Sequence, residues 1–122
     1  MYWLNVSGLK DLLPELLKTR IYAGISAGSI VASKTLALLG QDKKDYYRKH
    51  FNYEIDKCLD YVDFYIRPHF GAESKESVTP DYFAEKAKRL SKTVYALDHD
   101  SALKVIDGKV EVISEGKYLK LN

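Results

Sequence analysis

A Gly-x-Ser-x-Gly pattern is the clearest chemical signal in the sequence. It runs from Gly24 through Ser26 to Gly28, between two apolar segments. The pattern is typical of a sharp turn from a strand into a helix, which exposes the central serine hydroxyl. The two glycines would let neighbouring backbone pass close by, and the amide of Ala27 would point at a developing oxyanion. The alternative is a glycine-rich turn that simply packs a helix tightly on a strand.

A serine in this role needs a general base, because an unactivated hydroxyl is a poor nucleophile. The three candidates are His50, His69 and His99. His50 stands in a charged stretch typical of a surface, and His99 lies between Asp98 and Asp100, where it could be a turn residue. His69 directly follows a predicted strand, and ligands gather at the carboxyl ends of strands in open α/β sheets. We therefore take His69 as the candidate base, with a loop histidine at a strand end as the alternative.

Three segments resemble the peptidase E (aspartyl dipeptidase) and cyanophycinase family of serine hydrolases. The matches occur in the family's order and cover nearly the whole chain. By this resemblance Ser26 corresponds to the family nucleophile and His69 to the catalytic histidine, with the Ala27 amide as one oxyanion donor. The resemblance also implies a fold like that of class I glutamine amidotransferases, a doubly wound α/β sandwich. The segments are Ala23-Gly-Ile-Ser-Ala-Gly-Ser-Ile-Val-Ala, Asp63-Phe-Tyr-Ile-Arg-Pro-His-Phe and Tyr95-Ala-Leu-Asp-His-Asp-Ser-Ala-Leu.

The chain departs from the family pattern in two places. Family members have a front section that ends in a Gly-Gly-Asn/Asp-Thr turn and supplies the second oxyanion donor. That section has no counterpart here, so we expect a domain truncated at its N-terminus. His99 stands where the family often has a catalytic glutamate. Asp98 or Asp100 would then orient the imidazole of His69, or both aspartates would merely shape the turn.

Composition narrows the classes of protein. The chain has 122 residues, 46% hydrophobic and 30% charged, which predicts one soluble domain over residues 1–122. A net charge of +2 argues against a nucleic-acid partner. No apolar run reaches the roughly 18 residues of a membrane helix, and no signal peptide is evident, so we expect a cytoplasmic protein without a membrane partner. Because no metal-ligand spacing occurs, we expect neither metal nor cofactor. The single cysteine, Cys58, is expected in the core.

Helical spacing of apolar residues predicts three helices. Pro14 would kink or break the first of them, because proline removes a backbone donor and clashes with the preceding turn. The polar and aromatic stretch 41–61 would form a partly helical surface excursion, and residues 71–78 a polar loop. The helices are expected over 9–19 (capped by Ser7), 29–39 (ended by Gly40) and 80–90 (capped by Thr79, with Pro80 at its first position).

Short apolar runs bounded by turn residues predict the strands. The strongest local signal is Asp107-Gly108, which is typical of a two-residue hairpin turn. Alternation of strands and helices before this C-terminal hairpin favours an α/β domain with a doubly wound, mainly parallel sheet. The strands are expected over 21–25, 62–66, 93–97, 102–106, 110–113 and 118–121.

Together these features predict the C-terminal part of a serine peptidase or dipeptidase. Ser26 would attack the carbonyl of a small peptide, His69 would take its proton, and water would release the acyl-enzyme. Two alternatives stay open. One is a non-catalytic remnant or interaction module, inactive because the front section is missing. The other is an amidotransferase-like relative, although amidotransferases carry cysteine at this turn.

The absence of the front section also predicts that the chain associates with another chain. Strand 21–25 would lose its neighbours and become an apolar edge, which is a template for pairing. The apolar faces of helices 9–19 and 29–39 would be uncovered as well. We therefore expect a homo-oligomer or a complex with a complementary N-terminal fragment.

Overall fold

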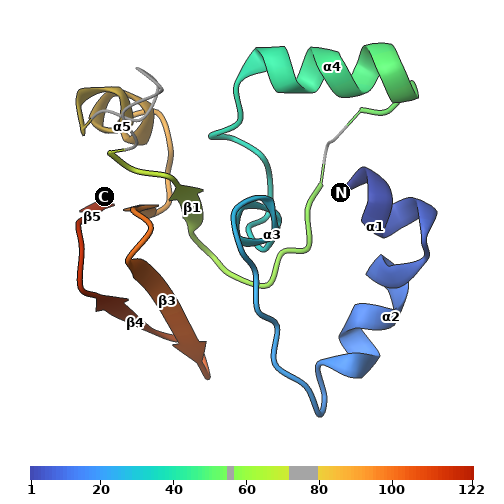
Figure 1. Cartoon of the computed structure of the whole chain (residues 1–122), viewed down its shortest axis with the longest axis horizontal. Coiled ribbons are helices and arrows are strands. Elements are labelled where there is room, and N and C mark those ends of the chain that lie inside the picture. The colour runs from blue at the N-terminus through green and yellow to red at the C-terminus, as the bar shows by residue number, and fades with distance from the viewer. Residues whose placement is uncertain (55–56, 72–79) are drawn as a thin grey trace. The chain divides into compact units, whose positions relative to one another are not determined.

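The computed structural model describes residues 1–54, 57–71 and 80–122 (Figure 1). The chain divides into two compact units, Met1–Tyr61 and Val62–Asn122, and each is described by itself. None of the helices in the described ranges is long and apolar enough to cross a membrane. The single domain expected over the whole chain stays a prediction.

Helices dominate the first unit. The sequence did not predict its first helix, and Ser7 ends that helix rather than capping the next one. Gly8, with φ of 73°, makes the turn into the second helix, which contains Pro14 and ends three residues earlier than expected. The fourth helix confirms the partly helical excursion. These helices are α1 (Tyr2–Val6), α2 (Leu9–Leu16), α3 (Ala27–Val31) and α4 (Gln41–Phe51) (Figure 1).

The helix predicted over residues 29–39 is wrong beyond Val31. The carbonyl groups from Val31 to Lys34 accept N–H groups of residues 58–61 at 2.8–3.2 Å. These partners, distant in sequence, take the carbonyls that a longer helix would use for its own bonds. Gly40 then stands in an extended conformation immediately before α4, instead of ending a helix.

The core of the first unit forms where these two segments meet. Cys58 is buried there, which confirms the sequence prediction, and burial raises the pKa of its thiol. The fully packed members are Val31, Leu36, Cys58 and Leu59, with partly buried Met1, Leu4, Leu13, Tyr22, Ile30, Leu39 and Tyr61 around them.

The strand predicted over residues 21–25 is not formed by the described chain. These residues connect α2 to α3 without pairing with any described strand. Their exposure nevertheless alternates as in a strand: Ile21 is 94% and Ile25 89% exposed, whereas Tyr22 and Gly24 are half-buried. A strand requires a neighbour for its backbone groups, and the described residues supply none here.

The second unit is built around β2 (Val94–Leu97), whose four residues are all buried. β2 pairs in parallel with β1 (Tyr65–Pro68) and antiparallel with β5 (Tyr118–Leu121). The expected mainly parallel sheet is therefore wrong for this unit, whose described sheet is small and mixed. β5 runs antiparallel because no helical crossover carries the chain back before it. β1 begins later than predicted, since Val62–Phe64 bend before the pairing starts.

Both faces of β2 are covered, since successive side chains of a strand point to opposite sides. Ala96 packs with Phe83 of α5 (Pro80–Ala87) on one face. Tyr95 and Leu97 pack on the other face against Leu103 and its neighbours in the hairpin. This two-sided burial explains the unbroken apolar run of β2 in the sequence.

The C-terminal hairpin confirms the Asp107-Gly108 prediction. Both residues have positive φ, 49° and 75°, as a two-residue turn that matches strand twist requires. The turn joins β3 (Ser101–Ile106) to β4 (Lys109–Ser114), which pair antiparallel.

Helix α5 is shorter than expected. It ends at Ala87, and the Asn122 side chain donates to the carbonyl groups of Ala87 and Leu90 at 2.7 and 3.0 Å. The Thr79 cap and all but residue 71 of the polar loop predicted over 71–78 lie outside the described residues.

The carboxylate of Asp98 ties the end of β2 to the hairpin and to the segment before β5. One oxygen accepts the Ser101 hydroxyl at 2.6 Å and the Asp100 N–H at 3.1 Å, and the other accepts the Lys117 N–H. The Ser101 hydroxyl, the backbone donors and the nearby His99 lower the pKa of Asp98 from its ordinary value of 3.8, against the opposing effect of desolvation.

This lowered pKa predicts acid-sensitive stability. The contribution of ionised Asp98 is complete above pH 3.8, and it is lost as the pH falls towards and through the lowered pKa of the folded state. Asp98→Asn should remove this component of the acid loss, whereas Asp107→Asn, at an exposed turn aspartate, should retain it. Thermal melts between pH 2 and pH 6 measure the difference. Parallel pH profiles for wild type and Asp98→Asn would contradict the assignment.

Candidate active site

The backbone of Ser26 has a conformation that few non-glycine residues adopt. Its φ is 52° and its ψ −112°, and it directly precedes α3. A side chain at positive φ costs about 1–2 kcal/mol, so the surrounding turn must hold it there. Such strain is typical of functional sites. The geometry agrees with the sharp turn predicted from the Gly-x-Ser-x-Gly pattern.

Gly24 is required by a close approach of two backbone segments. A Cβ at this position would lie 2.7–2.8 Å from backbone atoms of Gly28 and Ser29. Gly28 itself has more room, since the nearest atom to an added Cβ is the Tyr22 hydroxyl at 3.9 Å. The two glycines of the motif therefore differ in function: the first permits contact and the second does not depend on lacking a side chain.

Hydrogen bonds close the turn around Ser26. The carbonyl of Ser26 accepts the N–H groups of Ser29 and Ile30 at 3.1 and 3.2 Å. The Tyr22 hydroxyl donates to the Gly28 carbonyl, and the Ser29 hydroxyl donates to the Gly24 carbonyl, each at 2.7 Å. Sequence reasoning missed both side chains. The hydroxyl of Ser29 in the first helical turn was the available signal, because serine often bonds nearby backbone.

Ala27 follows the serine as the first residue of α3 and is exposed. A backbone amide at this position belongs to the unpaired N–H groups of a helix start. The motif predicts this amide as an oxyanion donor, and that role stays a prediction.

The second unit brings His69 beside the Asp98–His99 turn. Parallel pairing sets Pro68 opposite Leu97, so the residues that follow the two strands emerge at the same edge. The Phe70 N–H donates to the Leu97 carbonyl at 2.9 Å and fixes this arrangement. The imidazole rings of His69 and His99 lie 5.2 Å apart between centroids, tilted by 52°.

The two candidate aspartates differ in their surroundings. The Asp98 carboxylate is used by the turn, which supports the turn-shaping alternative for this residue. Asp100 is exposed, and its backbone carbonyl accepts the Glu115 N–H at 3.1 Å. Which of them orients His69 stays a prediction. Ser26 belongs to the first unit and His69 to the second.

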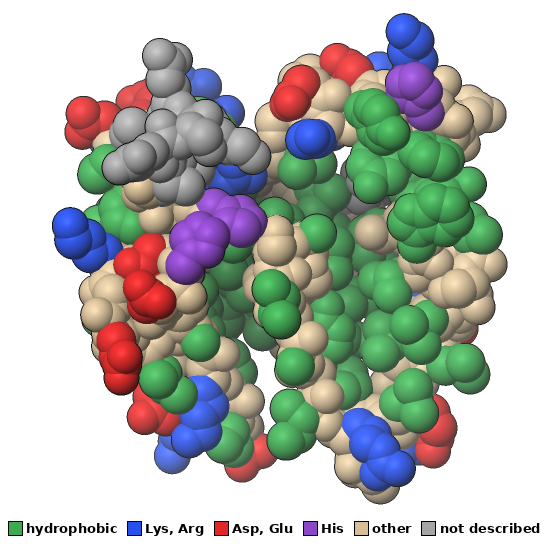
Figure 2. Space-filling model, viewed as in Figure 1, with side chains coloured by type: hydrophobic (Ala, Val, Ile, Leu, Met, Phe, Trp, Pro, Cys, Tyr) green, Lys and Arg blue, Asp and Glu red, His purple; other side chains and the backbone are tan. Residues whose placement is uncertain are grey.

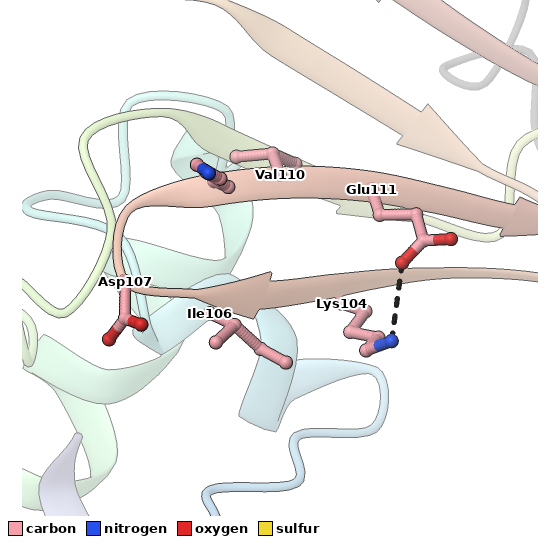
Figure 3. Close-up of a pocket in the computed structure, with 6 residues that line it drawn as sticks. Lys104, Ile106, Asp107, Val110 and Glu111 are labelled. Atoms are coloured by element: carbon pink, nitrogen blue, oxygen red, sulfur yellow. Dashed lines mark ion pairs between the residues drawn. The ribbon is translucent and has the colours of Figure 1, made fainter.

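Other features of the described chain do not add to this chemistry. His50 is exposed on α4 with its ring 4.5 Å from that of Tyr46, which confirms it as a surface residue. Among the described residues no group of three His, Cys, Asp or Glu side chains could hold a metal ion. A surface hollow on the hairpin, crossed by the 3.3 Å Lys104–Glu111 ion pair, contains none of the predicted site residues (Figure 3).

The contrast between the two glycines gives a matched pair of variants. Gly24→Ala should lower the free energy of unfolding by roughly 1–3 kcal/mol, because the added methyl group overlaps backbone that must shift. Gly28→Ala should leave stability unchanged or slightly raised, since alanine favours helix and meets no close atom. Urea unfolding of both variants provides the measurement, and equal stabilities would contradict the close approach.

The chain matches one protein family and is similar in fold to a solved structure. The family model described as Peptidase family S51 matches residues 2–113. A solved structure from Listeria monocytogenes EGD-e, provisionally assigned as a peptidase E protein, is similar in fold, with a TM-score of 0.70 and 23% identity. The match covers 93% of this chain and 52% of that chain, so this chain spans about half the length of the solved protein. No curated protein matches the chain.

The family match includes all three segments on which the resemblance was based. Ser26, in its strained turn, and His69, beside the Asp98–His99 turn, both lie inside the matched range. This chain belongs to peptidase family S51, the family of serine hydrolases that includes peptidase E and cyanophycinase.

Proposed function

We propose that this chain carries the nucleophile and the base of a serine peptidase that acts on small peptides. The Ser26 oxygen adds to the peptide carbonyl carbon, and its proton passes to His69. His69 gives that proton to the departing amine as the C–N bond breaks, which leaves an ester on Ser26. Water, deprotonated by His69, then releases the acid and restores the serine.

The observation that carries this proposal is the backbone of Ser26. A serine held at φ of 52° between two glycines, directly before a helix, is the arrangement in which hydrolases expose a nucleophile. An ordinary connecting turn would favour glycine here, because glycine adopts this φ and ψ without the steric cost that a side chain adds.

The geometry of the second unit supports His69 as the general base. His69 follows a strand that is parallel to β2, and its ring lies near that of His99. Asp98 or Asp100 orients the His69 imidazole in this proposal, and the Ala27 amide binds the oxyanion. Asp100 is the better candidate, because the turn already uses the carboxylate of Asp98.

We also propose that a partner chain completes the sheet next to residues 21–25. Ile21 and Ile25 are almost fully exposed, and hydrophobic side chains lie open on the face drawn in Figure 2. Strand-forming segments beside residues 21–25 would complete the doubly wound sheet, and a layer packed on its face would cover the two isoleucines. The partner is either a second copy of the chain or a complementary fragment equivalent to the front half of the family fold, which also supplies the second oxyanion donor.

A fluorophosphonate probe tests both the nucleophile and the partner. We expect the probe to label Ser26, identified by peptide mapping, when the chain is mixed with the complementary half. If a second copy is the partner, labelling instead grows with the concentration of the chain alone.

Serine variants provide the control. Ser26→Ala should abolish labelling, and Ser7→Ala, at an exposed serine outside the turn, should leave it unchanged. Labelling that persists in Ser26→Ala, or a mapped adduct on another residue, would contradict the proposal.

A further inference from the structure

We infer that Tyr22 and Ser29 are positioning residues that hold the backbone of Ser26 in its strained conformation without help from a partner. The inference deepens the proposed function, because it explains how the nucleophile is prepared. It depends on hydrogen bonds and packing inside the first unit, where all of these residues lie.

Tyr22 holds the helical side of the turn. At the end of α3 the Ala32 N–H donates to the Ser29 carbonyl at 3.3 Å instead of reaching back to Gly28. The Gly28 carbonyl instead accepts the Tyr22 hydroxyl at 2.7 Å. A side chain four residues before the nucleophile thus supplies a bond that a regular helix would make for itself.

The ring of Tyr22 is itself fixed by the core. It packs edge-on against Tyr61, with centroids 5.6 Å apart, and belongs to the cluster around Val31 and Leu59. Burial and the neighbouring Tyr61 raise the pKa of the Tyr22 phenol from 10.0, so it remains a protonated donor at neutral pH.

Ser29 connects the two arms of the turn. Its hydroxyl donates to the Gly24 carbonyl at 2.7 Å, and its N–H donates to the Ser26 carbonyl at 3.1 Å. The first bond holds the segment before the nucleophile, and the second holds the nucleophile's own peptide group. With Gly24 in contact with the backbone of Gly28, the turn is closed from both sides.

These contacts lie on the side of the segment opposite its exposed side chains. Tyr22 and Gly24 are half-buried, whereas Ile21, Ala23 and Ile25 are exposed. A partner that covers the isoleucines would therefore leave the bonds around Ser26 untouched. The geometry points to a nucleophile turn that is formed before any partner binds.

Nuclear magnetic resonance of the purified chain tests this inference directly. The HN–Hα coupling and the Cα and Cβ shifts of Ser26 report its φ, and hydrogen exchange reports the Ser29 and Ile30 amides that bond to its carbonyl. Wild type should show positive φ at Ser26 in the absence of a partner. Tyr22→Phe and Ser29→Ala should each shift the Ser26 resonances and speed exchange of the two amides about tenfold, as expected for loss of one hydrogen bond.

Two conservative variants separate positioning from packing. Ser29→Thr keeps the hydroxyl and should restore the wild-type coupling. Tyr61→Phe makes the same phenol-to-phenyl change on the ring that contacts Tyr22, and it should leave Ser26 unaffected. Circular dichroism melts show whether a variant has unfolded globally. The two single variants remove different bonds, so each tests the role of one residue.

Wild-type coupling and exchange at the turn in both Tyr22→Phe and Ser29→Ala would overturn the inference, as would a negative φ at Ser26 in the wild-type chain without a partner. The readout is backbone geometry, so it does not depend on reaction with a probe. A chain that shows the expected couplings but never labels at Ser26 would contradict the proposed function and leave the positioning role standing.

Discussion

The contact between Gly24 and the backbone of Gly28 is the constraint on which the candidate site depends. A Cβ at Gly24 would come within 2.7–2.8 Å of that backbone, so only glycine allows the chain to fold back so tightly. The fold-back puts Ser26 at positive φ at the start of α3. The cost of that conformation is offset by the packed core behind the turn, where Val31 and Leu59 meet. Stability and chemistry are therefore linked within one short segment.

In the second unit, the pairing of β1 with β2 holds His69 at the end of β1. β2 is buried on both faces, by α5 and by the hairpin, and it therefore holds the paired strand β1 in place. Parallel pairing then brings His69 beside the turn that begins at Asp98. The Asp98 carboxylate joins three donors from that turn and from the segment before β5. One of the two aspartates that the sequence suggests as catalytic partners is thus used to shape the turn.

The sequence correctly predicted the turns, whose backbone conformation depends on residues that are close together in the chain. Asp107-Gly108 predicted the hairpin because two consecutive positive φ values favour those residues. The Gly-x-Ser-x-Gly pattern predicted the sharp turn at Ser26, because glycine allows the close approach of backbone that this turn needs. The predictions failed where the structure depends on hydrogen-bond partners that are distant in the sequence. Helix α3 ends at Val31 because the N–H groups of residues 58–61 bond to the carbonyl groups that a longer helix would use. Residues 21–25 form no strand because no described strand pairs with them. The side chains of Tyr22 and Ser29 were missed because a bond to a backbone carbonyl leaves little trace in sequence.

The central claim is the proposal that Ser26 and His69 act on one substrate carbonyl. A crystal structure of the phosphonylated protein, assembled with its partner, tests it most directly. The account predicts phosphorus bonded to the Ser26 oxygen, a phosphonyl oxygen accepting the Ala27 N–H, and the His69 imidazole within hydrogen-bond distance of the serine oxygen. An adduct on Ser26 with His69 far from that oxygen, or with another side chain in its place, would contradict the claim.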